Sequence, residues 1–345
     1  MIDVLIAGGG PAGLATALYA AQRGLEAVVV EPRAGVIDKA CGEGLMPAAV
    51  QRLAALGATP ARSHPFAGIR YVQGDLSCEG RFRGGVGLGV RRLALHQALL
   101  AAVERAGIRR VEGRVSEFRQ HADHVAALGL QARWGVAADG LYSPIRRGLG
   151  LDLPARLPPR VGLRRHFRVQ PWSDFVEVHW ADDVEAYVTP VADDEVGIAL
   201  LVDRGHGSPD HQTPFDRYLS RFPALRARLG EPTSTVRGAG PFEHRTSRRV
   251  AGRVLLVGDA AGYLDPLTGE GIRLGLLSAE ALVGALAAGD PARYEADWRR
   301  LAGPTFRMTA ALLWAARTPW IRRRMVAIPR RVPWIFGAIL NHLAG

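Results

Sequence analysis

The chain of 345 residues has only two cysteines, Cys41 and Cys78, and it contains no low-complexity segment or internal repeat. Two cysteines form neither a disulfide framework nor a metal-binding pattern, so the sequence predicts no metal site and a reducing compartment. No apolar run reaches the length of a membrane span, and Met1 leads directly into the first expected strand rather than into a secretory signal. These absences predict a cytoplasmic globular protein.

Lysine is almost missing as well, because Lys39 is the only lysine in a chain whose formal net charge is +11. Acidic residues are absent after Asp297, where arginines alternate with bulky residues such as Trp314 and Trp320. Nucleic acid is not the expected partner, since a mixture of basic and bulky apolar side chains suits a membrane surface better. Two interpretations stay open for residues 304–340: helices with solvated or snorkelling arginines, and peripheral contact with anionic lipid at the inner face of the membrane.

The N-terminal segment has the pattern of a nucleotide-binding unit. Residues 2–7 predict a buried parallel strand, residues 14–23 a helix, and residues 27–30 a second strand that is followed by Glu31. The turn before the helix carries the residues that let the backbone approach a pyrophosphate, which are Gly8, Gly10, Ala12 and Gly13. Glu31 has the spacing of a carboxylate that binds an adenosine ribose, and it would repel a 2′-phosphate. The unit is therefore expected to bind FAD or NAD rather than NADP.

Two more glycine-containing signatures follow far along the chain. The second is Asp139-Gly140, followed by Ser143 and Arg146, and the third is the sequence Gly-Asp-Ala-Ala-Gly at residues 258–262. Ser143 and Arg146 are expected to brace the Asp-Gly turn rather than to do chemistry. Three signatures in this order are typical of a chain that wraps one FAD molecule, so the sequence predicts an enzyme that moves electrons through a flavin.

Together the signatures resemble those of the flavoprotein monooxygenase family related to p-hydroxybenzoate hydroxylase, over the chain up to about Gly289. The resemblance extends to the branch that contains geranylgeranyl reductases and flavin-dependent halogenases. It implies that Arg92, with Arg91 as the competing residue, contacts FAD, that Val115 lies at the adenine, and that Asp259 binds the ribityl chain. The other FAD-binding positions that it implies, besides the glycine turn and Glu31, are Arg33, Asp139, Gly258, Pro266, Gly269, Gly271 and Ile272.

The resemblance also implies an α/β fold. We expect a Rossmann-like FAD-binding domain of the glutathione-reductase-2 type, an inserted, mostly antiparallel β-sheet substrate domain and a helical C terminus. The expected division is residues 1–68, 89–158 and 250–290 for the FAD-binding domain, 69–88 and 159–249 for the substrate-binding sheet, and 291–345 for the arginine-rich helical segment. Residue patterns predict strands over 111–118 and 125–132, a helix over 215–229 and a helix break at Pro304.

Two segments help to indicate which branch of the superfamily the chain resembles. Residues 41–45, Cys-Gly-Glu-Gly-Leu, resemble the Cys-Gly-x-Gly-Leu segment of geranylgeranyl reductases and are expected beside the isoalloxazine ring. The Tyr-x-Trp-x-Phe-Pro segment of those reductases appears only as Glu-Ala-Tyr-Val-Thr-Pro at residues 185–190, and the Trp-x-Trp-x-Ile-Pro motif of halogenases is missing. Short chains of this kind also resemble the flavin hydroxylases that accompany type III polyketide synthases and oxidise lipid-tailed phenols such as alkylresorcinols.

Few side chains are candidates for the chemistry itself. Cys41, Glu43 and His179 are the catalytic candidates, and Glu43, His166 and Tyr187 are the substrate-binding candidates. Structural alternatives stay open for them. Cys41 could be a buried packing residue, Glu43 a charge at a helix N terminus, and either histidine a surface or satisfied core residue.

The function that the resemblance favours is a single-component FAD monooxygenase. NADH or NADPH would bind transiently and reduce the flavin, and O2 would form a flavin C4a-hydroperoxide that hydroxylates an electron-rich, lipophilic phenol. The main alternative is a flavin-dependent reductase of isoprenoid C=C bonds. A third hypothesis is a flavin-dependent protein without enzymatic activity that binds membranes or has a regulatory role. The sequence does not give the oligomeric state.

Overall fold

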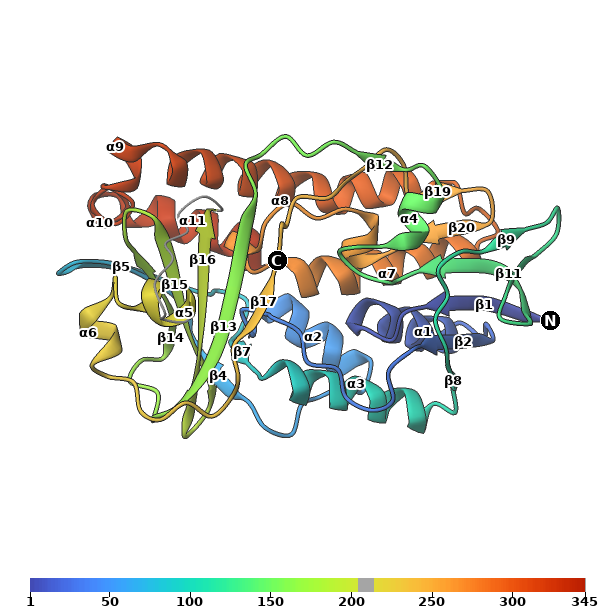
Figure 1. Cartoon of the computed structure of the whole chain (residues 1–345), viewed down its shortest axis with the longest axis horizontal. Coiled ribbons are helices and arrows are strands. Elements are labelled where there is room, and N and C mark those ends of the chain that lie inside the picture. Colours follow the sequence, from blue (N-terminus) through green and yellow to red (C-terminus); the bar gives the residue numbers. More distant parts are fainter. Residues whose placement is uncertain (204–213, 345) are drawn as a thin grey trace.

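The structure is a computed structural model that describes residues 1–203 and 214–344. Within these ranges, an eight-stranded sheet fills the end of the molecule that holds the N terminus (Figure 1). Its strands are β1 (Ile2–Ala7), β2 (Ala27–Glu31), β8 (Arg109–Glu112), β9 (Arg119–Gln120), β10 (Val125–Ala127), β11 (Leu130–Ala137), β19 (Val250–Ala251) and β20 (Val254–Leu256). Neighbours in the order β20-β11-β1-β2-β8 are parallel, so these strands end at one edge, where such sheets bind ligands.

Helices pack on this sheet and complete its core. They are α1 (Pro11–Gln22), α2 (Pro47–Ala55), α3 (Arg92–Arg105), α4 (Pro144–Gly148) and α7 (Gly271–Ala287). Helix α1 starts with a proline at its first turn and buries small residues such as Ala15, Ala17 and Ala20, which lets it contact both α3 and α7 closely. Strand β1 is buried on both sides, as expected for a parallel strand between covered faces.

A seven-stranded sheet forms the opposite end of the molecule (Figure 1). In the order β17-β13-β16-β15-β14-β5-β6, its strands are Arg237–Ala239, Arg160–Arg168, Glu195–Asp203, Val184–Ala192, Phe175–Trp180, Gly68–Gln73 and Leu76–Arg81. All pairs are antiparallel except β14 with β5. The sheet is therefore assembled from two distant stretches of the chain.

Alternation along the strands gives this sheet two different faces. On the outer face, Val184, Ala186 and Val188 of β15 pack with residues of α5 (Pro214–Leu219) and α6 (Pro223–Arg226). Glu185, Tyr187 and Thr189 of the same strand point to the inner face, which lies over the first sheet's ligand-binding edge. Apolar residues of the inner face join loop and helix residues in what we call the inner apolar cluster, which includes Met46, Phe66, Val176, Trp180, Leu267, Leu313, Met325, Val326 and Phe336.

Short elements connect the two sheets. A three-stranded sheet consists of β3 (Gly44–Leu45), β7 (Gly87–Gly89) and β4 (His64–Phe66), and a two-stranded one of β12 (Asp152–Leu153) and β18 (Arg245–Thr246). Two 3-10 helices, η1 (Gly258–Ala261) and η2 (Pro266–Thr268), lie between β20 and α7.

The C-terminal helices run along one side of the molecule and end beside the seven-stranded sheet (Figure 1). They are α8 (Arg293–Arg317), α9 (Pro319–Arg322), α10 (Ala327–Arg331) and α11 (Pro333–Ala344). Helix α8 contacts α7 at its start, while α10 and α11 contact β6. In the described part of the chain, no helix combines the length and the apolar character that crossing a membrane requires.

The predicted α/β class, with a Rossmann-type first sheet, a second mostly antiparallel sheet and a helical C terminus, is confirmed. Three local predictions are wrong. The strand expected over 111–118 ends at Glu112, where Gly113 donates to the Glu31 carbonyl and the chain leaves the sheet. The strand expected over 125–132 is split by a turn at Leu128-Gly129, and Pro223 divides the helix expected over 215–229.

The helix break expected at Pro304 is also wrong, because α8 continues through this proline. A proline inside a helix removes one backbone hydrogen bond and crowds the preceding turn. Helix α8 nevertheless buries a continuous stripe with helical spacing on both sides of the proline, which comprises Trp298, Ala302, Thr305, Thr309, Leu313 and Ala316. Tertiary packing of this stripe therefore outweighs the local preference.

Candidate functional site

All three glycine signatures follow strands that end at the ligand-binding edge of the first sheet. Gly8 follows β1, Asp139 lies two residues after β11, and Gly258 lies two residues after β20. Glu31 is the last residue of the intervening strand β2. The topology therefore brings together, at one crevice, segments that are more than a hundred residues apart in the sequence.

The first turn has the close backbone approach that requires glycine. Gly8 adopts φ +113°, and a Cβ atom on Gly13 would overlap the carbonyl oxygen of Gly8. Gly10 forms the N-cap of α1, Pro11 is its first residue and Ala12 follows, so the N–H groups of the first helical turn face the crevice edge. This geometry suits a pyrophosphate.

Glu31 is buried beside this turn, where both carboxylate oxygens have partners. Oε2 accepts a hydrogen bond from the Gly9 N–H at 2.8 Å, and Oε1 pairs with Arg33 Nε at 2.6 Å. Burial by itself would raise the pKa of Glu31, but the hydrogen bonds from Arg33 and Gly9 outweigh it and lower this pKa. The residue is therefore a fixed carboxylate at the end of β2. Val115 lies buried in the loop after β8, next to this strand.

His96 fixes the glycine turn from α3, a role that the sequence analysis did not assign to it. The Ile37 N–H donates to its Nδ1 at 3.1 Å, so Nε2 carries the proton and donates to the Gly9 carbonyl at 2.7 Å. Burial lowers the pKa of His96, which keeps the ring neutral. A single histidine in an apolar helix pattern gives no sequence signal for such a role.

Arg146 braces the second and third signatures, as expected, and Ser143 supports it. Its fully buried guanidinium donates to the carbonyls of Asp259, Ala260 and Leu141, at 3.3, 3.2 and 2.9 Å. The Ser143 Oγ accepts from the Arg146 N–H at 2.9 Å and caps α4. These contacts hold the Asp-Gly turn against η1 without using a ligand.

Several buried polar atoms at the crevice have no partner within the described residues. They are Nε and Nη1 of Arg92 and Oδ1 of Asp139. Burial lowers the pKa of Arg92 despite the nearby charges of Asp259 and Glu43, and burial raises the pKa of Asp259 against Lys39 and Arg92. The neighbouring Arg91 differs in part, because its Nη1 pairs with Glu195 at 3.3 Å although its Nε also has no partner. Because unpartnered buried polar groups are rare in folded proteins, these atoms indicate a polar ligand in the crevice, and FAD fits this donor set.

Two loops meet on the far side of the crevice. A Cβ atom on Gly269 would lie 3.9 Å from the Met46 side chain, so the segment Pro266–Ile272 lies beside the segment that starts at Cys41. The inner face of the second sheet holds both loops, since Tyr187 donates to the Leu267 carbonyl at 2.9 Å and Thr189 to the Gly42 carbonyl at 2.8 Å. Gly271 and Ile272 begin α7, whose N-terminal N–H groups suit the electron-rich edge of a flavin.

Glu43 and His166 form a buried hydrogen-bonded pair. Glu43 adopts φ +62°, and its Oε1 accepts from the Arg92 N–H at 2.8 Å, while Oε2 lies 2.6 Å from His166 Nε2. His166 Nδ1 in turn lies 2.8 Å from Ser234 Oγ, and neighbouring Arg164 pairs with Asp38. Both oxygens of Glu43 are thus engaged with protein groups.

Cys41 belongs to the crevice, whereas His179 does not. The Cys41 Sγ accepts from the Glu43 N–H at 3.4 Å, and burial raises the pKa of this thiol even though Arg92 lies near it. His179 lies on the outer face of β14, where its Nε2 is 3.0 Å from Glu177 Oε2 and its ring contacts Phe222. The structure brings Cys41, Glu43, His166 and Tyr187 to the inner side and leaves His179 on the other.

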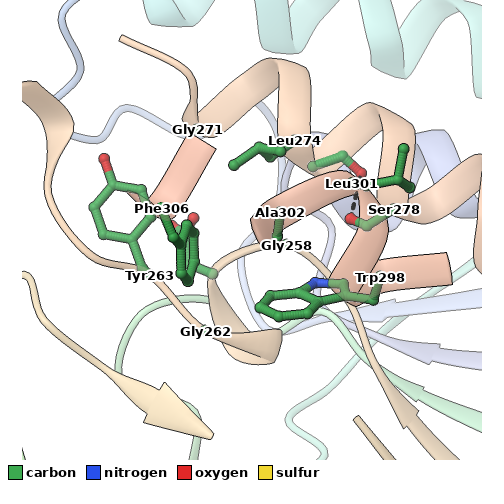
Figure 2. A pocket seen from close by; sticks show the side chains of 12 residues that line it. Gly258, Gly262, Tyr263, Gly271, Leu274, Ser278, Trp298, Leu301, Ala302 and Phe306 are labelled. Atoms are coloured by element: carbon green, nitrogen blue, oxygen red, sulfur yellow. Dashed lines mark hydrogen bonds between the residues drawn. The ribbon is translucent and has the colours of Figure 1, made fainter. Parts of the chain in front are cut away.

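A pocket adjoins the crevice between η1, α7 and α8 (Figure 2). Gly258 of the third signature lines it together with Tyr263, which follows that signature, Gly271 at the start of α7, and Trp298 and Phe306 of α8. Its walls are mostly apolar, and burial raises the pKa of the Tyr263 phenol well above its usual range. The pocket lies behind the third signature and adjoins the crevice through Asp259.

A family model described as an FAD binding domain matches residues 101–293, which is more than half of the chain, and a second model with this description matches residues 3–76. The chain belongs to the FAD binding domain family. It is therefore an FAD-dependent oxidoreductase, as the sequence analysis predicted.

Curated relatives and solved structures point to different members of this group. The menaquinone reductase of Mycobacterium tuberculosis is 28% identical over 81% of this chain and 76% of its own length. The digeranylgeranylglycerophospholipid reductase of Methanocella arvoryzae is 26% identical over 87% of this chain and 83% of its own. The flavin-dependent brominase Bmp2 superposes with a TM-score of 0.83 and 17% identity over 99% of this chain and 93% of its own. PqsL of P. aeruginosa, in complex with 2-aminobenzoylacetate, has a TM-score of 0.76 and 22% identity over 93% of this chain and 98% of its own. The two structural matches establish the fold only.

Proposed function

We propose that this FAD-dependent oxidoreductase reduces a C=C bond in a lipophilic substrate, with NADH or NADPH as the transient reductant. The observation that carries this proposal is the position of the Cys41 thiol at the crevice, where its Sγ accepts a hydrogen bond from the Glu43 N–H at 3.4 Å. Curated relatives of the chain include reductases whose names specify menaquinone and a digeranylgeranyl phospholipid. We therefore favour reduction of a C=C bond over hydroxylation.

The cofactor would lie across the crevice with its ADP half at the first sheet. Gly8, Gly10, Ala12, Gly13, Glu31, Arg33 and Val115 are proposed to hold this half. Arg92, Asp139, Gly258 and Asp259 are proposed to hold the pyrophosphate and ribityl region, and Pro266, Gly269, Gly271 and Ile272 the flavin ring. The unpartnered atoms of Arg92 and Asp139 support this assignment.

The second sheet is proposed to bind the substrate. The inner apolar cluster reaches the crevice at Met46 and Leu267, which belong to the two loops that meet there. An apolar wall at this point favours a substrate with a hydrocarbon chain over a small polar one, because the chain would otherwise be exposed to water. The division into an FAD-binding domain, a substrate-binding sheet and a helical segment, at the boundaries given above, remains part of the proposal.

The protonation of the side chains favours reduction over hydroxylation. Reducing a C=C bond adds a hydride to one carbon and a proton to the other, so it needs an acid at the site. Bound FAD would supply the hydride, received from NAD(P)H. The Cys41 thiol lies at the crevice, and burial raises its pKa, so it is protonated at neutral pH. We propose that it gives this proton to the second carbon and takes another from solvent. Hydroxylating a phenol instead needs a base, and both oxygens of Glu43 are already engaged.

Hydroxylation of a lipid-tailed phenol, with O2 as co-substrate, remains the second candidate. The residues at 185–190 support it, because the aromatic segment of the prenyl reductases is mostly lost there. Tyr187, the one aromatic residue that remains, donates its hydroxyl to the Leu267 carbonyl.

Anaerobic turnover separates the two candidates. Holoenzyme is incubated under nitrogen with NADH or NADPH and menaquinone, or with a geranylgeranyl phospholipid, and the product is analysed by mass spectrometry. Two added hydrogens that remain after air has reoxidised any quinol to the quinone support reduction of a C=C bond. If a long-chain alkylresorcinol gains one oxygen atom under air and no lipid is reduced under nitrogen, the reductase proposal is wrong.

The two cysteines provide a matched pair of variants. Cys41→Ser should lower the rate of reduction about a hundredfold while the protein keeps its FAD, because a serine hydroxyl is a much weaker acid. Cys78→Ser, on β6 beside α10 and α11, should leave the rate within about twofold. Equal rates for both variants would remove Cys41 from the mechanism.

A further inference from the structure

The last helices present large apolar side chains to solvent. Trp314, Trp320 and Trp334 are 65%, 59% and 73% exposed, and Ile328 is 46% exposed. The chain has seven tryptophans, and the other four are buried or half-buried. All of the exposed tryptophans thus fall within 21 residues, in helices α8, α9 and α11 at one end of the molecule (Figure 1).

Unpaired arginines accompany these side chains. Arg323, Arg324, Arg330 and Arg331 are exposed, and none of them forms an ion pair with an acid in residues 1–203 or 214–344. The chain has no acidic residue after Asp297. We call the exposed set Trp314, Trp320, Arg323, Arg324, Ile328, Arg330, Arg331 and Trp334 the tryptophan–arginine face.

Two other arginines of this segment show that the exposure is selective. Arg322 is buried and pairs with Glu185 at 2.5 Å, and it also donates to the carbonyls of Ala181 and Val184. Arg317 pairs with Asp203 at 3.0 Å. These two arginines attach the helices to the seven-stranded sheet, whereas the four exposed ones form no ion pair with the described residues.

We propose that the tryptophan–arginine face docks on the surface of an anionic lipid bilayer. Tryptophan prefers the boundary between lipid headgroups and acyl chains, and exposed arginines near a membrane are attracted to anionic headgroups. A second copy of this chain fits less well, because a symmetric dimer would bring the four arginines of one face against the same four of the other.

The position of the face also suits the proposed substrate, and this step rests on the proposed function. The same segment contributes Leu313 of α8, Phe336 of α11, and Met325 and Val326 between α9 and α10 to the inner apolar cluster. That cluster ends at Met46 and Leu267 beside the crevice. A lipid that leaves the bilayer at this face would therefore contact apolar side chains of this cluster along its way to the crevice.

The first test is sedimentation of the FAD-loaded protein with vesicles at low salt. We expect binding to vesicles of phosphatidylglycerol and phosphatidylcholine, little binding to phosphatidylcholine alone, and release at high salt, since exposed charges are screened there. Tryptophan fluorescence should shift to shorter wavelength on binding. This test needs no substrate, so its result is independent of the reaction that the enzyme catalyses.

A matched pair of charge variants separates the proposed face from the general basic charge. Arg323→Gln/Arg324→Gln should weaken binding to the anionic vesicles about tenfold or more. Arg109→Gln/Arg110→Gln removes an adjacent exposed pair at β8, at the other end of the molecule, and should change binding less than twofold. Equal weakening by both variants would show non-specific attraction and overturn the proposal.

A triple variant tests the apolar part. Trp314→Ala/Trp320→Ala/Trp334→Ala should reduce vesicle binding at least tenfold while bound FAD and Tm stay close to wild type. No vesicle binding by the wild-type protein overturns the proposal. So does a wild-type dimer in analytical ultracentrifugation that the triple variant dissociates, because the face would then be covered by a second copy.

Discussion

The two walls of the crevice are built in different ways. On the side of the eight-stranded sheet, backbone atoms and glycines form most of the surface, and the few charged groups follow strand ends directly. On the side of the seven-stranded sheet, charged side chains are buried together. Arg160 pairs with Glu185 and with Asp265 at 2.8 Å, and Arg322 joins them from α9.

This difference shows which kind of site a sequence reveals. A wall made of backbone needs particular residues in a row, because only glycine permits the close approach at Gly13. A wall made of side-chain pairs needs only that opposite charges meet in space, and their positions in the sequence are free. The first wall therefore has a motif and the second has none.

The largest effect is expected from adding a side chain to the glycine turn on the side of the eight-stranded sheet. Gly13→Ala would place a methyl group onto the Gly8 carbonyl, so we expect loss of FAD and a fall of Tm by more than about 10 °C. Absorbance near the flavin bands and thermal unfolding measure both.

Gly10→Ala is the control for this prediction, since nothing lies within 4 Å of its Cβ position and its φ is −74°. The apoprotein should unfold at the wild-type temperature, while FAD affinity should fall if the pyrophosphate lies on this turn. Normal FAD binding by Gly13→Ala would contradict the geometry of this wall.

The next effect concerns the charged wall. Glu185→Gln leaves Arg160 and Arg322 without a buried carboxylate that both use, so the free energy of unfolding should fall by about 3 kcal/mol or more. Glu79→Gln, which breaks an exposed pair with Arg70, should change it by less than about 1 kcal/mol. Urea unfolding of both variants makes the comparison, and equal values would show that the buried cluster adds nothing.

A neighbouring pair of arginines tests the assignment of the crevice. Arg92→Met removes the guanidinium whose Nε and Nη1 have no protein partner, so FAD should bind roughly tenfold to a hundredfold more weakly. Arg91→Met breaks the pair that Nη1 of this guanidinium forms with Glu195 and should leave FAD affinity within about threefold. Fluorescence titration of the apoproteins with FAD gives both constants. The reverse order would assign Arg91 to the cofactor.

The smallest effect is a pH dependence of stability. Burial raises the pKa of Asp265 to about 6 and that of Glu270 to about 7, against the opposing charges of Arg160 and Arg273. The folded protein then holds protons that the unfolded chain releases, so stability should fall as pH rises from about 4 to about 7.

Variants of two glutamates, one buried and one half-exposed, separate this pH dependence from the effect of removing any negative charge. Glu270→Gln should remove its part of the pH slope of Tm, a few degrees across this window. Glu280→Gln on α7, with a half-exposed carboxylate, should keep the slope. A wild-type Tm that rises through this window would mean that both acids are ionised in the fold.

Much of the fold could be predicted because its signals are local. The strand–turn–helix–strand unit at residues 2–31 follows from apolar runs, glycines and one acid, and the order of the signatures predicts which strand ends meet. Helix α8 was missed at Pro304 because its buried stripe is visible only when the partners of Thr305 and Thr309 are known. The strand expected over 111–118 ends early, because the apolar residues Val115 and Phe118 are buried in the loop that follows it, where the chain has left the sheet.

The sequence by itself determined the nucleotide-binding edge, since glycine conformations and helix N termini are properties of short stretches of chain. Only the tertiary structure decided which charged side chains are paired inside the protein and which are exposed at its surface. Arg322 and Arg323 are adjacent in the chain, yet one is buried against Glu185 and the other faces solvent. Their difference arises because a helix points successive residues in different directions, and only the packed neighbours determine which direction is the interior.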